Sequence, residues 1–107
     1  MRLLLDTNIF LWCVKDDIHF TKSARSKIIQ ASEVYVSSAS IWEATIKKKL
    51  NKLDVEIEEL VEAITESGFL ELPINSVHAA TVSRLSDIHR DPFDRILIAQ
   101  AISEPLL

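Results

Sequence analysis

Apolar positions along the chain follow two different spacings. Short apolar or β-branched runs at residues 2–5, 33–37 and 69–72 are typical of strands covered on both faces, as in a parallel sheet. Between and after these runs, apolar residues recur at helical spacing. The helices we predict cover residues 8–14, 21–31, 40–49, 56–67, 76–85 and 91–103. Strands that alternate with helices predict an α/β fold: a three-layer α/β/α sandwich with a central, mainly parallel sheet.

Two of the predicted helices begin with the same local pattern. Ser40-Ile41-Trp42-Glu43 matches a capping box, which places Glu43 at N3 of its helix. In Asp91-Pro92-Phe93-Asp94, Asp91 is the expected N-cap, proline occupies N1 and Asp94 occupies N3. Glu43 and Asp94 therefore each have a structural explanation as capping residues, and taken singly this explanation is the stronger one.

Other element ends are also visible in the sequence. Thr21 is the expected N-cap of the second helix, and Gly68 lies where a C′ residue closes the fourth. Residues 105–107, Pro-Leu-Leu, are interpreted as the opening of a further strand. We treat residues 1–107 as one domain, because glycine, proline and low-complexity segments mark no linker.

Composition limits the possible classes of protein. With 48% hydrophobic and 26% charged residues the chain is globular, and its apolar runs are too short to span a membrane. We see no signal peptide, and the single cysteine, Cys13, forms no internal disulfide, so a reducing cytoplasm is the expected compartment. A net charge of −4 argues against a broad basic surface for nucleic acid. It is compatible with an acidic metal site that meets a phosphate through the ion.

Three acids fall where a strand or loop passes into a helix: Asp6, Glu43 and Asp94. Asp6 follows a strand directly, at the sheet edge where parallel folds bind ligands, although it suits a cap equally well. If these helix starts face one edge of the sheet, the carboxylates converge. Oxygen ligands favour Mg²⁺ or Mn²⁺, which activates water and stabilises charge on phosphate. The residues alone thus indicate a metal-dependent phosphodiester hydrolase.

The same segments resemble a known family. LLLDTN at residues 3–8, SSASIWEATIKKKLNKL at 37–53 and HRDPFDRILIAQA at 89–101 are similar, in this order, to the successive motifs of PIN-domain toxin ribonucleases. These are the toxin halves of VapBC-type toxin–antitoxin pairs. The third motif is the most specific of the three. The resemblance covers nearly the whole chain.

The resemblance implies a Mg²⁺-dependent (or Mn²⁺-dependent) endoribonuclease that cuts RNA, is blocked by a cognate antitoxin and forms a homodimer. It implies that Asp6, Glu43 and Asp94 are the catalytic, metal-binding acids. It assigns further residues to the surroundings of the site. These are Thr7, Asn8 and Ser38 as polar lining residues and Asp91 as a further acid that caps or supports the site. From their place beside the third motif, Arg95 and Arg90 are candidate contacts to substrate phosphate or to an inhibiting partner, or equally ion-pair partners of a neighbouring acid.

One departure from the family leaves alternatives open. Family members usually continue into a strand with a Thr-x-Asp motif that brings a fourth acid, and this sequence ends at Leu107. We therefore expect the domain to lack its final strand and helix. The alternative function is a weakly active or inactive module that binds the antitoxin or dimerises. A phosphatase with a strand-end Asp nucleophile ranks lower, since it needs a second Asp where this chain has Asn8.

Some basic and imidazole groups have two interpretations. Lys47, Lys48, Lys49 and Lys52 are either a solvated helix end or a contact to RNA phosphates, with the first favoured slightly. His78 is expected to be a packing or surface residue. Arg90 and His89 precede the third motif and are expected near the site.

Overall fold

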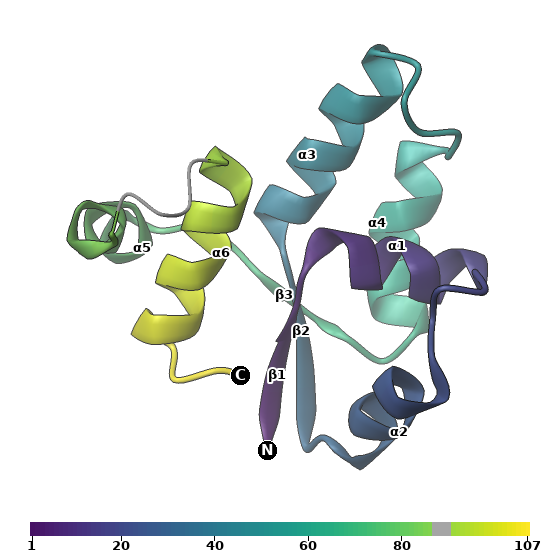
Figure 1. The fold of residues 1–107 in the computed structure, drawn as a ribbon, viewed down its shortest axis with the longest axis horizontal. Helices are drawn as coiled ribbons and strands as arrows, with labels where there is room; N and C mark the ends of the chain where they lie inside the picture. Colours follow the sequence, from purple (N-terminus) through teal and green to yellow (C-terminus); the bar gives the residue numbers. More distant parts are fainter. Residues whose placement is uncertain (87–90) are drawn as a thin grey trace.

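A parallel sheet forms the centre of the computed structural model, which describes residues 1–86 and 91–107. β1 (Arg2–Leu5) pairs with β2 (Glu33–Ser37), and β2 pairs with β3 (Leu70–Leu72), in the order β1-β2-β3. Helices flank the sheet on both sides (Figure 1). The predicted α/β fold is confirmed.

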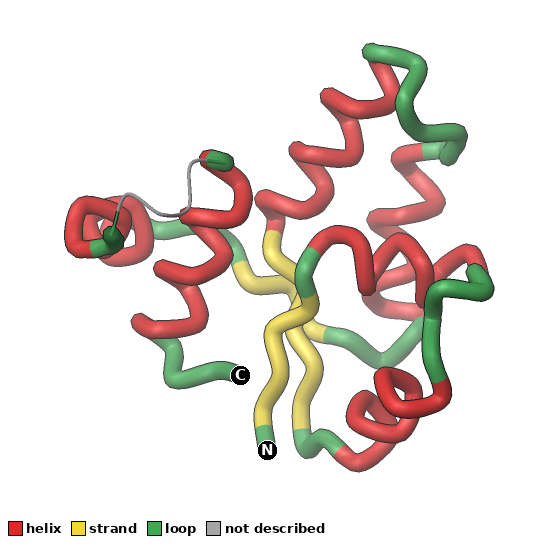
Figure 2. The backbone as a smooth tube through the Cα atoms, viewed as in Figure 1, coloured by secondary structure: helices red, strands yellow, loops and turns green. Residues whose placement is uncertain are grey.

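The helices fill the connections between and after the strands. They are α1 (Thr7–Lys15), α2 (Lys22–Gln30), α3 (Ser38–Lys49), α4 (Ile57–Glu66), α5 (Ser76–Thr81) with the 3₁₀ turn η1 (Val82–Arg84), and α6 (Pro92–Ser103). α1, α2 and α4 lie on one side of the sheet, and α5 and α6 lie on the other (Figures 1 and 2). Within the described part of the chain, no helix is long and apolar enough to cross a membrane.

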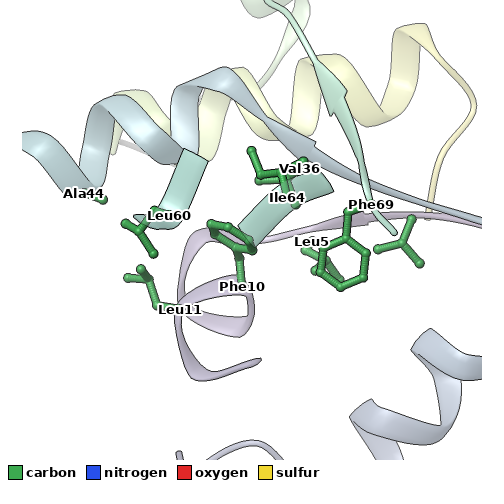
Figure 3. Packing of buried hydrophobic residues seen from close by; sticks show 9 residues of the cluster. Leu5, Phe10, Leu11, Val36, Ala44, Leu60, Ile64 and Phe69 are labelled. Atoms are coloured by element: carbon green, nitrogen blue, oxygen red, sulfur yellow. The ribbon is translucent and has the colours of Figure 1, made fainter. Parts of the chain in front are cut away.

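The hydrophobic core lies between the sheet and the helices on the side of α1 and α4. Leu5 is paired with Val36 in the β1–β2 register, so the two side chains share this face. Phe10 from α1 and Leu60 from α4 pack against them, each with 1% of its surface exposed (Figure 3). Burying a side chain of this size contributes roughly 1.5–3 kcal/mol.

The start of α3 differs from the prediction. The helix begins at Ser38, and the N-cap is Ser37, whose hydroxyl accepts a hydrogen bond from the Ala39 amide at 3.0 Å. The predicted start at Ser40 is wrong, and so is the capping box that placed Glu43 at N3. Ser37 ends β2 and caps the helix that follows at once, while the Ser40 hydroxyl is engaged elsewhere. Glu43 consequently lies in the second turn of α3.

Other predicted element ends are confirmed. The hydroxyl of Thr21 accepts from the Ala24 amide and caps α2. Gly68 follows α4 with a φ of +77°, in the left-handed region that favours glycine at C′. Leu107 donates to the Arg2 carbonyl and accepts from the Leu4 amide, at 3.1 and 2.9 Å. These two hydrogen bonds place Leu107 beside β1, but residues 105–107 form no strand in the structure, so the further strand stays a prediction.

Candidate active site

The carboxyl ends of the three strands meet at one edge of the sheet, because the strands are parallel. Asp6 follows β1 at this edge and is exposed. Its Oδ1 accepts a hydrogen bond of 2.8 Å from the Ile9 amide, so Asp6 is the N-cap of α1. Asp6 therefore lies at the edge where open α/β sheets bind ligands.

A buried hydrogen bond joins the segment of Asp6 to α3. The Thr7 hydroxyl donates to the Ser40 hydroxyl at 2.9 Å, and the two residues are only 4% and 1% exposed. Thr7 is adjacent to Asp6, and Ser40 precedes Glu43 by about one helical turn. The contact thus fixes the two acid-bearing segments against each other. Sequence reasoning assigned Thr7 to the site but missed Ser40, which it interpreted only as a cap.

Glu43 is buried on α3 and already has a cationic partner. The Lys47 ammonium lies 3.0 Å from its carboxylate, one helical turn further along. A buried carboxylate needs a compensating charge, and here a lysine of the same helix supplies it. Lys48 pairs in turn with Glu56 at 3.5 Å. Two of the four lysines of the basic run are therefore engaged in ion pairs within the chain.

The third acid lies at the start of α6, which runs from the carboxyl edge of the sheet back toward the start of β1 (Figure 1). Asp91 is the N-cap, and its Oδ1 accepts from the amides of Phe93 and Asp94 at 2.8 and 3.2 Å. The predicted cap at Asp91 and the predicted N3 position of Asp94 are both confirmed. Asp94 is exposed, within the first turn, where the helix dipole favours a carboxylate.

An aromatic contact joins α6 to α3 beside these acids. The rings of Trp42 and Phe93 meet edge to face, with centroids 5.2 Å apart and an interplanar angle of 84°. Trp42 is adjacent to Glu43, and Phe93 is adjacent to Asp94. One hydroxyl contact and one ring contact thus tie the three acid-bearing segments together at one edge of the sheet.

The remaining predicted site residues have separate roles. Ser38 accepts a hydrogen bond from the Ile74 amide at 3.3 Å, which links the ends of β2 and β3. Asn8 is exposed at the second position of α1. Arg95 donates to the carbonyls of Ser86 and Val82, so it holds the η1 segment against α6. His89 and Arg90 lie outside the described residues.

A second polar cluster, which sequence reasoning missed, lies between α5 and α6. His78 is fully buried, and its Nδ1 accepts from the Asn75 amide at 3.1 Å while its Nε2 lies 2.8 Å from Glu104. Gln100, also fully buried, donates from Nε2 to the Leu72 carbonyl at 3.3 Å. The sequence feature that could have revealed this cluster is Gln100, a polar residue within the otherwise apolar run LIAQA. The cluster anchors α5 to α6 and to the end of β3.

The three acids suit a divalent ion in their chemistry, because hard cations prefer carboxylate oxygens. As placed, they do not enclose one. Within residues 1–86 and 91–107, no group of three or more His, Cys, Asp or Glu side chains lies close enough together to hold a metal ion. Glu43 instead forms an ion pair with the Lys47 ammonium. Coordination by all three acids requires their side chains to draw together and that ion pair to open.

The fold places this chain among the open parallel α/β proteins, which bind their ligands at the carboxyl ends of the strands, where the three acids lie. The chain belongs to the PIN domain family, whose model matches residues 3–106. PIN domains are generally nucleases, and they usually use divalent metal ions. No curated protein matches the chain in sequence.

Proposed function

We propose that this chain is a Mg²⁺- or Mn²⁺-dependent endoribonuclease, the toxin of a toxin–antitoxin pair, which hydrolyses phosphodiester bonds in RNA. Membership of the PIN family supports a nuclease. The observation that carries the proposal is the joining of three acid-bearing segments at one sheet edge, through the Thr7–Ser40 hydrogen bond and the Trp42–Phe93 contact.

In this proposal Asp6, Glu43 and Asp94 hold the ion. A divalent ion held there would activate a water molecule for attack and would stabilise negative charge on the scissile phosphate. The chain positions the acids: Thr7 and Ser40 hold the end of β1 against α3, and Asp91 fixes the first turn of α6. Lys47 neutralises Glu43 when no other cation is present.

The proposed partners follow from the toxin assignment. They are an RNA substrate, a cognate antitoxin that blocks the site, and a second copy of the chain. We place the protein in the cytoplasm, where RNA is available and where the single thiol of Cys13 stays reduced.

Cleavage of single-stranded RNA in the presence of Mg²⁺ or Mn²⁺ tests the proposal. We expect the wild-type chain to cut RNA, chelation to stop it, and Asp6→Asn to reduce the rate by two orders of magnitude or more, about 2.7 kcal/mol of transition-state stabilisation. Asp54→Asn is the matched control, because Asp54 is an exposed acid in the loop after α3. An Asp6→Asn protein that cuts at the full metal-dependent rate would refute the assignment.

A second candidate is a PIN module that binds partners without catalysis. It is favoured by one observation: no three acids within the described residues enclose an ion, and Glu43 is paired with Lys47. A folded protein that binds its antitoxin and shows no metal-dependent cleavage would support this function over the first.

A further inference from the structure

The ion pair between Glu43 and Lys47 differs from an ordinary pair on a helix surface. Pairs of this spacing are common on exposed helices, where both groups stay hydrated and the attraction is weak. Here the side chain of Glu43 is only 11% exposed, whereas that of Lys47 is 35% exposed. The Lys47 ammonium, 3.0 Å from Oε2, compensates a negative charge that has lost most of its hydration.

The two partners differ in their freedom to move. Glu43 lies on a part of α3 that is fixed to the neighbouring segment, because Ser40, about one turn before it, accepts the buried hydrogen bond from Thr7. Within residues 1–86 and 91–107, the ion-pair partner of the Lys47 ammonium is Glu43, and the ammonium sits on a flexible four-carbon stem. If the pair opens, the lysine moves and the acid stays in place.

A divalent ion and the Lys47 ammonium compete for the same carboxylate. Both bind its oxygens, and a charge of +2 repels a charge of +1 at the short distance that a shared carboxylate imposes. The competition rests on the proposed function, in which Glu43 is a metal ligand. Binding of the ion to Glu43 therefore requires Lys47 to move away.

Helix geometry keeps the displaced ammonium near the site. Side chains on a helix lean toward its N-terminus, and α3 begins at the carboxyl edge of the sheet, directly after β2 (Figure 1). In the proposed function a phosphate of the RNA lies at this edge, and a lysine is a suitable partner for its charge. We propose that Lys47 exchanges partners: it holds Glu43 in the metal-free protein and binds an RNA phosphate once a divalent ion occupies the site.

The neighbouring lysines of α3 are placed differently. Lys48 pairs with Glu56, the residue before α4, at 3.5 Å. Lys49 is exposed and lies two positions beyond Lys47, which is about 200° further around the helix. Lys49 therefore carries the same charge on the same helix but does not face Glu43, which makes Lys49→Met a matched control.

Calorimetric titration of Mn²⁺ into the wild type, Lys47→Met and Lys49→Met tests the first half of the exchange. Methionine keeps an unbranched stem and removes the charge. We expect Lys47→Met to bind Mn²⁺ roughly tenfold more tightly than the wild type, because the ion no longer displaces an ammonium, and Lys49→Met to stay within about twofold. A Lys47→Met chain that binds Mn²⁺ no more tightly than the wild type would overturn the proposal.

RNA affinity tests the second half, and the expected change has the opposite sign. The probe is a single-stranded 2′-O-methyl oligonucleotide with phosphorothioate linkages, which resists hydrolysis, and fluorescence anisotropy measures its binding at saturating Mn²⁺. Lys47→Met should bind it roughly three- to tenfold more weakly than the wild type, and Lys49→Met should stay within about twofold. A lysine with a merely structural role would weaken both metal and RNA binding when it is removed. An unchanged RNA affinity of Lys47→Met would contradict the exchange.

Acetylation of the unaltered chain, read by mass spectrometry, gives a test that does not depend on the folding of a variant. An ion-paired ammonium reacts slowly because the pair must open first. We expect saturating Mg²⁺ to speed acetylation of Lys47 several-fold and to leave Lys49 unchanged. No change at Lys47 while Mg²⁺ binds would refute the exchange.

Failure of the proposed function gives a different set of results. If neither the wild type nor Lys47→Met binds Mn²⁺ or Mg²⁺, the metal site is absent, and the proposed function and the exchange are both refuted. If the metal, RNA and acetylation results are as expected but RNA is bound and not cut, the nuclease function is refuted and the exchange is supported.

Discussion

The Thr7–Ser40 hydrogen bond offers a direct test of how the site is held together. Thr7→Val replaces the hydroxyl with a methyl group of nearly the same shape, at a position that is only 4% exposed. The change removes a 2.9 Å hydrogen bond and leaves the Ser40 hydroxyl buried without its partner. A net hydrogen bond contributes about 1 kcal/mol, and an unsatisfied buried group costs about 1–3 kcal/mol. We expect Thr7→Val to lower the free energy of unfolding by about 2 kcal/mol.

Urea unfolding followed by circular dichroism measures this loss, and a double-mutant cycle isolates the pair. Ser40→Ala alone should cost a similar amount, and the double variant should cost less than the sum, with a coupling of about 1 kcal/mol. Thr45→Val is the matched control, since Thr45 is exposed on α3 and, among the described residues, its hydroxyl donates to the Ile41 carbonyl of its own helix. It should change stability by about 0.5 kcal/mol or less. Equal losses for Thr7→Val and Thr45→Val, with no coupling, would show that the contact does not hold β1 to α3.

Three further predictions concern other parts of the fold. Asp91→Ala removes the side chain that accepts hydrogen bonds from two amides of α6. Urea unfolding should show a free energy of unfolding about 1 kcal/mol lower. An unchanged free energy of unfolding would contradict the capping role. His78→Ala empties a fully buried position and leaves the Asn75 amide unpaired. We expect the free energy of unfolding to fall by about 3 kcal/mol in the same assay. A fall below about 1 kcal/mol would refute the anchoring role. Burial raises the pKa of the Cys13 thiol, against a smaller opposing effect of Arg25. Alkylation near pH 8, read by mass spectrometry, should therefore be slower in the folded than in the urea-unfolded chain. The raised pKa of Cys13 also contributes stability that is present below the unfolded thiol pKa of about 8.5 and is lost as the pH rises through the folded pKa. Equal alkylation rates in the folded and unfolded chain would contradict the raised pKa. So would a free energy of unfolding that rises across this pH range.

The alternation of strands and helices was readable from the sequence because each element carries a clear period and a clear end signal. Thr21, Gly68 and Asp91 end or begin their helices as expected, since a hydroxyl, a glycine and a carboxylate each satisfy backbone groups locally. The start of α3 was not readable. Ser37, Ser38 and Ser40 all suit an N-cap, and the end of β2 and the buried bond from Thr7 decide between them.

The three candidate acids were predicted from their place in the chain, and the structure puts Asp6, Glu43 and Asp94 on segments that meet at one edge of the sheet. That they bind a metal ion stays a prediction. The contacts that these acids make depend on the tertiary structure, which the sequence pattern does not give. The Lys47–Glu43 spacing was visible in the sequence, but the burial that makes Glu43 need a partner was not. The same holds for His78, whose contacts lie 22 and 26 residues further along the chain.

Whether Asp6, Glu43 and Asp94 hold one divalent ion is tested most directly by calorimetric titration of Mn²⁺ and Mg²⁺ into the folded chain. Asp94→Asn serves as the variant, and Asp54→Asn serves as the control. We expect the wild type and the control to bind one ion per chain, and Asp94→Asn to lose most of that affinity. A folded wild type that binds neither ion, or an Asp94→Asn chain that binds as tightly as the wild type, would contradict this assignment of the metal site.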